Sequence, residues 1–255
     1  MSRKKIDKKK ENYERLPFDQ YFTDTSDDWC GHTGIIVNQV NYKNIEYEYN
    51  GIKYDATYDV LYDAKRNCIQ CHFQGSSGAG DWVTNFLFVA KYYDSFIDQR
   101  TGKRIQLKVH MGWARMYKAM KHTIRTSVAT LLEEHPDAEV EVIGWSLGSA
   151  MAQLCVQDLN YNLGVRSYLY TYGSVNPFKM CIFAVHKTKK YLKSCCKAVY
   201  CFSHRSDIVT YVVPWILGFR KINRVSLGNF SFFGLFNPMV YHCDYWKAEL
   251  YEGIE

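Results

Sequence analysis

The fold is decided by the stretch Val140-Glu141-Val142-Ile143-Gly144-Trp145-Ser146-Leu147-Gly148-Ser149-Ala150-Met151-Ala152. Its first half is rich in β-branched residues and predicts a strand, because such side chains suit a pleated surface. Its second half, with alanine, methionine and leucine, predicts a helix. The two glycines leave room for a sharp turn, since a Cβ there would clash with the strand or the helix.

This turn carries the pattern Gly144-x-Ser146-x-Gly148, a nucleophile elbow that lifts a serine hydroxyl to the top of a sheet. The N-terminus of the following helix offers free N–H groups and partial positive charge to a developing oxyanion. An ordinary glycine-rich turn is the alternative. The strand before and the helix after favour the elbow, and Ser146 is the candidate nucleophile.

A serine nucleophile needs a general base and an acid that orients the base. In enzymes built on this elbow, the chain order is Ser, then Asp or Glu, then His. Two carboxylates lie between Ser146 and His242, namely Asp158 and Asp207, and His242 is the only histidine after Asp207. We expect Asp158, on the helix after the turn, to be solvated or capping. Asp207 follows a predicted strand, where sites on open α/β sheets form.

The order therefore predicts a triad of Ser146, Asp207 and His242 for acyl transfer. His242 would remove the serine proton, Asp207 would fix its tautomer, and water would hydrolyse the acyl-enzyme. Taken singly, Asp207 could form an Asx-turn, and His242 could be a structural histidine, in the core or at the surface, whose hydrogen bonds are satisfied. Finding all three residue types in the required order favours the triad.

An oxyanion hole needs two donors, and the first is expected from the backbone N–H of Leu147. The second is expected from the small-residue loop after the strand that ends at Phe73, where Gly75 and Ser76 lie. Ser76 adds a hydroxyl donor. Losing one such donor typically costs roughly 2.7–4 kcal/mol of transition-state stabilisation.

The net charge is +6 and the sequence pI is about 8.7, which does not indicate a nucleic-acid-binding protein. Basic residues cluster before residue 11 and between Lys187 and Lys197. The simpler interpretation is a solvated tail and loop. The alternative is peripheral contact with an anionic membrane surface, where each basic side chain contributes about 1 kcal/mol.

The chain has nine cysteines, an odd number without a regular framework, and we recognise no secretory signal in it. We therefore expect reduced thiols in the cytoplasm. No apolar run is long enough to predict a transmembrane helix. The pattern Cys68-x-x-Cys71-His72 lies in a predicted strand, where positions three apart face opposite sides. No second pair completes a zinc site, so we expect neither a metal nor another cofactor.

One α/β domain is predicted from 17 to 255 after a flexible basic segment, 1–16. Its mostly parallel sheet is expected to begin with antiparallel strands, and helices are expected to flank it.

Segment 91–108 predicts no clear element, and composition does not separate a flap from a surface connection. The apolar, glycine-rich stretch 215–240 predicts a core flank or a pocket wall. Strands are predicted at 35–40, 45–49, 57–62, 67–73, 140–143, 167–172 and 199–202, and a helix from Trp113 to Leu132.

Four sets of local motifs resemble the class 3, fungal-lipase-like family of the α/β-hydrolases. They span about residues 60–246. The matching segments are Phe73–Ser76 with Asp81–Phe86, Val109–Trp113, Ile143–Ala150 with Tyr170–Ser174, and Asp207–Val209 with Pro214, Tyr241 and His242. The chain departs from the family pattern at Gln74, where the family has Arg, and at Thr210, where it has Pro.

The resemblance implies an α/β-hydrolase fold and a carboxylic-ester hydrolase acting on lipids, most simply an acylglycerol lipase. It implies that Ser76 is the side-chain oxyanion donor, that His110 is a buried structural residue, and that the loop after Phe88 is a lid. A phospholipase A and a small-ester esterase stay open as alternatives. A catalytically idle lipase-like scaffold is the non-enzyme alternative. The sequence does not indicate an oligomeric state.

Overall fold

The computed structural model describes residues 43–49, 52–73, 90–98, 101–211, 215–232, 236, 238–243, 245 and 248–251. The predicted strand 35–40 and the loop that holds Ser76 lie outside the described residues. So does the segment 1–16, and the division into that segment and one domain from 17 to 255 stays a prediction.

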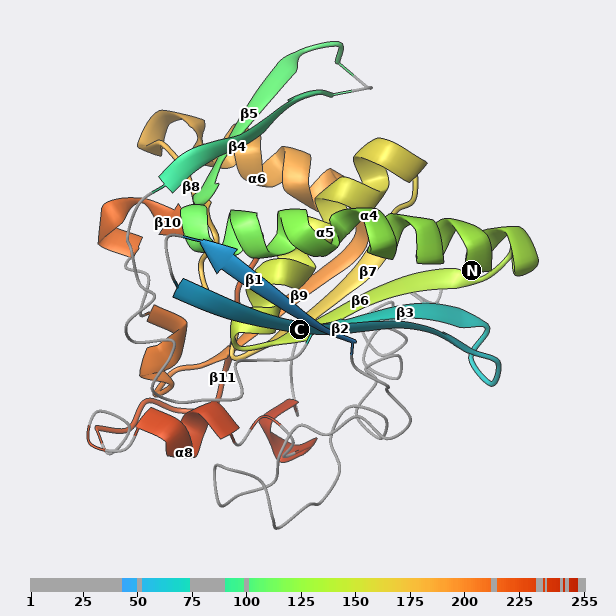
Figure 1. Ribbon diagram of the computed structural model, residues 1–255. Coiled ribbons are helices and arrows are strands. Elements are labelled where there is room, and N and C mark those ends of the chain that lie inside the picture. The colour runs from blue at the N-terminus through green and yellow to red at the C-terminus, as the bar shows by residue number, and fades with distance from the viewer. Residues whose placement is uncertain are drawn as a thin grey trace, which may run out of the picture.

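A seven-stranded sheet forms the centre of the fold, in the order β1-β2-β3-β6-β7-β9-β11 (Figure 1). The pairs β1/β2 and β2/β3 are antiparallel, and every later pair is parallel. The predicted antiparallel start and mostly parallel sheet are therefore confirmed. The strands are β1 (Lys43–Tyr49), β2 (Ile52–Asp63), β3 (Cys68–Phe73), β6 (Glu139–Trp145), β7 (Ser167–Tyr172), β9 (Cys196–His204) and β11 (Val225–Leu227).

Three longer helices lie on one side of this sheet, and α8 lies on the other (Figure 1). The predicted amphipathic helix forms as α4; its apolar residues at three- and four-residue spacing are buried from Trp113 to Val128, and Leu131 and Leu132 are partly buried. The helix after the elbow forms as α5 and ends at Gly164 in the left-handed conformation. The helical segments are α4 (Met111–Glu134), α5 (Leu147–Leu163), η1 (Ile182–Ala184), α6 (Val185–Ser194), η2 (Ile208–Tyr211), η3 (Trp215–Leu217), α8 (Pro238–Cys243) and η5 (Ala248–Tyr251).

A smaller antiparallel sheet has the order β10-β8-β5-β4. Its strands are β4 (Ala90–Ile97), β5 (Arg104–His110), β8 (Phe178–Lys179) and β10 (Phe219–Arg220). The prediction of no clear element at 91–108 is thus wrong, because β4 and β5 form a hairpin there. Ile105, Leu107 and Val109 are buried on alternate positions of β5, a period of two that lies in the order of the residues and that composition alone does not show.

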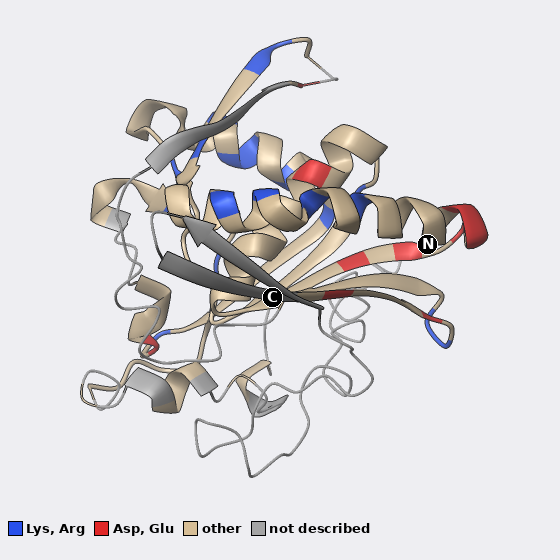
Figure 2. Cartoon of the chain, viewed as in Figure 1, with Lys and Arg blue, Asp and Glu red and all other residues tan. Residues whose placement is uncertain are grey.

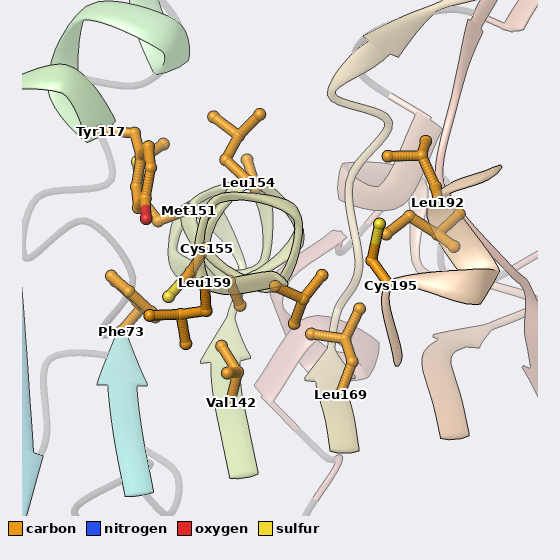
Figure 3. Packing of buried hydrophobic residues seen from close by; sticks show 14 of the residues in the cluster. Phe73, Tyr117, Val142, Met151, Leu154, Cys155, Leu159, Leu169, Leu192 and Cys195 are labelled. Carbon is orange, nitrogen blue, oxygen red and sulfur yellow. The ribbon is translucent and has the colours of Figure 1, made fainter. Parts of the chain in front are cut away.

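The two faces of the large sheet carry separate apolar clusters, because neighbouring strand residues point to opposite sides. On β6, Val140 and Val142 belong to the cluster under the helices, whereas Ile143 and Trp145 belong to the other. Figure 3 shows Cys155 of α5 among apolar side chains of the neighbouring strands. The second cluster is aromatic and includes Tyr170, Tyr172, Phe202, Tyr245 and Tyr251.

Asp158 contradicts the expectation of a solvated or capping side chain. It is buried, accepts a hydrogen bond from the Tyr117 hydroxyl at 3.1 Å, and lies 3.4 Å from Nε of Arg125. Burial raises the pKa of this carboxyl, and Arg125 and Tyr117 oppose the rise. The cause is that α4 packs over α5, so the side of α5 that bears Asp158 does not face water.

In the described part of the chain, no helix combines the length and hydropathy that a membrane crossing needs. The same residues contain no cluster of His, Cys, Asp and Glu suited to a metal ion. The free thiols include Cys68, Cys71, Cys155, Cys181, Cys195, Cys196 and Cys201, and Cys181 is the exposed one among these.

Replacing Gly144 tests the packing of the strand against the helix after the turn. A Cβ at this position would lie 2.4 Å from the backbone oxygen of Gly148 and 2.9 Å from Cβ of Ala152. We expect Gly144→Ala to lower the free energy of unfolding by about 2 kcal/mol or more, because backbone cannot yield as a flexible side chain does. Urea unfolding measures the change. Gly102→Ala is the control, since its Cβ would meet no atom within 4 Å, although its φ of 63°, a strain that Gly144 does not share, disfavours alanine; an equal or larger loss there would contradict the packing argument.

The buried His72 makes stability depend on pH. Burial lowers its pKa to about 3 from 6.5. Between these values the unfolded chain binds a proton that the folded chain does not. The contribution of His72 to the free energy of unfolding therefore falls by about 1.4 kcal/mol for each pH unit below 6.5. We expect His72→Gln to flatten the slope of unfolding free energy between pH 6.5 and 4.5. The exposed His186, replaced by Gln, should leave that slope unchanged; equal slopes in wild type and His72→Gln would contradict the account.

Candidate active site

Ser146 occupies the turn between β6 and α5 with φ of 53° and ψ of −120°. A positive φ is uncommon for a residue other than glycine and marks a conformation that the surroundings must hold. The Ser146 N–H donates to the carbonyl of Tyr172 at 2.9 Å, and its carbonyl accepts from the N–H of Ser149 at 3.0 Å. The strand–turn–helix context predicted for the elbow is therefore present, and Ser146 is half-buried.

Ser149 fastens this turn to the neighbouring strand end. Its hydroxyl donates to the Ser146 carbonyl at 2.5 Å and accepts from the N–H of Val175 at 3.0 Å. Gln153, one turn further along α5, donates to the carbonyls of Ser149 and Val175. These buried contacts fix the start of α5 against the segment that follows β7.

Asp207 and His242 form a buried pair, although 35 positions separate them in the sequence. Nδ1 of His242 lies 2.9 Å from Oδ2 of Asp207, and neither side chain exposes more than 2% of its surface. Asp207 follows β9 at the carboxyl end of the sheet, whereas His242 comes from α8. A carboxylate at Nδ1 selects the tautomer in which Nε2 is the proton acceptor.

Both oxygens of Asp207 have partners. Oδ1 accepts the N–H of Val209 at 3.0 Å, which is an Asx-turn, while Oδ2 accepts from His242 and from the hydroxyl of Tyr245 at 2.7 Å. One oxygen thus makes the Asx-turn that the sequence allowed, and the other contacts His242, while the role of Asp207 as the acid stays a prediction. The turn fixes the carboxylate in the orientation that His242 needs.

Tyr245 is a site residue that the sequence did not single out. Its hydroxyl accepts the backbone N–H of His204 at 2.7 Å and donates to Asp207. Burial and the Asp207 carboxylate raise the pKa of Tyr245 well above its usual value, so the hydroxyl stays protonated as a donor. The one signal in the sequence is its position three residues after His242.

The imidazole of His242 lies against the residue that precedes the candidate nucleophile. The rings of Trp145 and His242 stack with centroids 5.1 Å apart, and Nε1 of Trp145 donates to the His242 carbonyl at 3.2 Å. Gly173, with φ of 56°, gives the imidazole its space, because a Cβ there would lie 2.7 Å from Cε1 of His242. The chain thus brings His242 to the elbow by contacts with Trp145 and Gly173.

Of the two predicted oxyanion residues, the structure describes Leu147 but not Ser76. Leu147 is the first residue of α5, directly after Ser146, so its N–H belongs to the helix end whose amides have no partner within the helix. Ser76 lies outside the described residues, and its role stays a prediction. His110 is buried at the start of α4, where its ring lies 4.4 Å from that of Trp113.

The strained serine, the buried His242–Asp207 pair and the helix end make an arrangement suited to nucleophilic acyl transfer. Comparison with known proteins agrees with it. The family model described as lipase (class 3) matches residues 71–216. This range contains Ser146 and Asp207 but ends before His242.

Among curated proteins, a lipase from Rhizomucor miehei is 30% identical over 124 residues, which are 47% of this chain and 32% of that protein. The secreted mono- and diacylglycerol lipase 1 of Fusarium solani is 29% identical over 164 residues, 63% of this chain and 44% of the relative. The matched part thus spans less than half the length of either curated relative.

Among solved structures, the native Rhizomucor miehei lipase propeptide complex superposes with a TM-score of 0.58 at 24% identity. The match covers 74% of this chain and 57% of the other, and it shows that the two share the α/β-hydrolase fold. Since the family model spans more than half of the sequence, this chain belongs to the class 3 lipase family.

Proposed function

We propose that this protein hydrolyses carboxylic esters of lipids through an acyl-enzyme on Ser146, with His242 as base and Asp207 as the acid that orients it. The observation that carries the proposal is the buried His242–Asp207 pair, held against Trp145 beside a serine in a strained elbow. Membership of the class 3 lipase family supports the same chemistry.

In the proposed mechanism, Nε2 of His242 takes the proton of the Ser146 hydroxyl as its Oγ attacks the ester carbonyl carbon. The Leu147 N–H stabilises the oxyanion, and Ser76 is proposed as the second donor. The carbon–oxygen bond to the alcohol breaks, and His242 returns the proton to the leaving alcohol. Water then attacks the acyl-enzyme by the same steps in reverse, which releases the carboxylic acid and restores Ser146.

For the substrate we propose acylglycerols, because the Fusarium solani relative is named a mono- and diacylglycerol lipase. Phospholipids and small soluble esters are the alternatives. A panel of tri-, di- and monoacylglycerols, phosphatidylcholine and short p-nitrophenyl esters separates them, with Ser146→Ala as the blank. Faster turnover of long-chain acylglycerols in dispersion than of monomeric short esters supports a lipase, and the reverse order indicates an esterase.

We further propose peripheral contact with an anionic lipid surface through an apolar patch made of Ile182, Phe183, Ile216 and Leu217. Their exposed fractions are 79%, 98%, 77% and 46%, which is unusual for adjacent large apolar side chains. Ile182, Ile216 and Leu217 line one cavity of about 600 Å³. Four lysines follow in α6, where Figure 2 colours parts of the ribbon blue, so basic residues adjoin the apolar patch.

A reducing, cytoplasmic setting also stays a proposal. Buried free thiols at Cys68, Cys71, Cys155, Cys195 and Cys196 support it.

Changing the triad should abolish ester hydrolysis. We expect Ser146→Ala to lower kcat by about 10⁴-fold to 10⁶-fold and Asp207→Asn by about 10⁴-fold, because the first removes the nucleophile and the second the tautomer control. Hydrolysis of a short p-nitrophenyl ester measures both. Ser149→Ala, which alters the fastening of the same turn, is expected to keep measurable activity. Wild-type rates in Ser146→Ala would show that Ser146 is not the nucleophile, and an inactive wild type on every ester would favour an idle scaffold.

Removing an aromatic ring from the apolar patch should weaken membrane binding. We expect Phe183→Ser to reduce the partition coefficient on anionic vesicles by about tenfold, since burying a phenylalanine contributes about 1.5–3 kcal/mol. Sedimentation with vesicles at low and high salt measures it. Phe230→Ser, which removes an exposed phenylalanine just after β11, should bind like wild type. Equal binding of wild type and Phe183→Ser, or no vesicle binding at any salt concentration, would contradict the proposal.

A further inference from the structure

A second cavity, distinct from the apolar patch, is lined by four basic side chains. It has a volume of about 220 Å³, enough for several water molecules. Lys189 comes from α6, Arg220 from β10, and Lys221 and Arg224 from the segment that follows β10. Among the residues that the structure describes, the lining contains no carboxylate.

These cations repel one another in a partly dehydrated space. Burial lowers the pKa of Lys189, and Lys193 and Arg220 lower it further. Burial also lowers the pKa of Lys221, to about 8, and Lys189 adds to that effect. Asp207 acts in the opposite direction on Lys221, but it is already engaged by His242, Tyr245 and Val209. The described lining therefore brings four basic side chains together with no Asp or Glu among them.

Lys221 is a buried donor held at a fixed place. Its ammonium donates to the carbonyl of Ser174 and, at 2.7 Å, to the hydroxyl of Ser203. A lysine ammonium has three N–H donors, so one donor has no partner in the described part of the chain. A buried N–H without a partner costs free energy, and an anion in the cavity would supply an acceptor.

Arg224 is held by a neutral aromatic partner. The centre of its guanidinium lies 4.8 Å from the ring centroid of Tyr211, and Nη2 donates to the Tyr211 hydroxyl. This contact orients the guanidinium but leaves its charge uncompensated. Thr210, next to Tyr211, also lines the cavity. The lining thus combines planar guanidinium donors, ammonium groups and the Tyr211 hydroxyl, groups that bind tetrahedral oxyanions, while the Thr210 hydroxyl is already donated to a backbone carbonyl.

We propose that this cavity binds a phosphate group. The ligand is either inorganic phosphate or the phosphate of a lipid head group, since both present the same oxygens. The inference stands on Lys189, Arg220, Lys221 and Arg224 and does not depend on the hydrolase activity. Thr210 donates to the backbone carbonyl of Asp207 at 2.8 Å, so the occupied cavity lies beside the turn that carries the proposed triad acid.

Phosphate should stabilise the folded protein through this cavity. In low-salt buffer we expect inorganic phosphate at ten times its Kd to raise Tm by about 3 °C above the value in chloride of equal ionic strength. Lys189→Gln combined with Arg224→Gln should lose at least half of this rise. Lys190→Gln, which removes an exposed lysine next to Lys189 on α6, should keep it.

The source of the phosphate is distinguished by a second ligand, a short-chain phosphatidic acid below its critical micelle concentration. Tighter calorimetric binding of this lipid than of inorganic phosphate assigns the cavity to a head group, and equal or weaker binding assigns it to free phosphate. Short-chain phosphatidylcholine, whose phosphate also carries a choline, tests whether a phosphate with a second substituent still enters the cavity. The proposal is overturned if phosphate and chloride give the same Tm, or if the double variant responds to phosphate as fully as Lys190→Gln.

Discussion

The structure depends on one close approach, where β6 passes under the start of α5. Gly144 lies so near the backbone of Gly148 that no side chain fits between them. This contact forces the chain to turn within one residue, and Ser146 adopts a positive φ as a result. Because β6 lies between β3 and β7 in the sheet and α5 packs on it, the strained residue is held from both sides. The same geometry places the serine at the carboxyl end of the sheet with the helix N-terminus behind it.

His242 and Asp207, the proposed base and acid, come to this turn from the C-terminal part of the chain. Asp207 is fixed by its own Asx-turn, and Tyr245 and His242 meet on its second oxygen. Trp145 then couples the histidine to the elbow, since the same indole stacks on the imidazole and donates to the His242 backbone. The two halves of the proposed site are therefore joined by packing around a tryptophan within the elbow itself.

Much of this could be predicted from the sequence, because the elbow is a local pattern and only two carboxylates precede His242 in the required interval. Tyr245 could not, since its position three residues after His242 does not mark Asp207, 38 positions away, as its partner. The burial of Asp158 was missed because it depends on α4 packing over α5, which no local period reports. The strands β8 and β10 of the smaller sheet were missed for a similar reason, because each has two residues and exists only through pairing with distant strands.

The central claim is that Ser146 is an activated nucleophile whose reactivity depends on the buried pair. Labelling with an active-site-directed fluorophosphonate, followed by peptide mapping, tests it most directly. The account predicts one phosphonyl group on Ser146 in the wild type, none in Ser146→Ala, and much slower labelling in Asp207→Asn, whose amide cannot orient the imidazole correctly. A label on another residue, or equal labelling rates in wild type and Asp207→Asn, would contradict it.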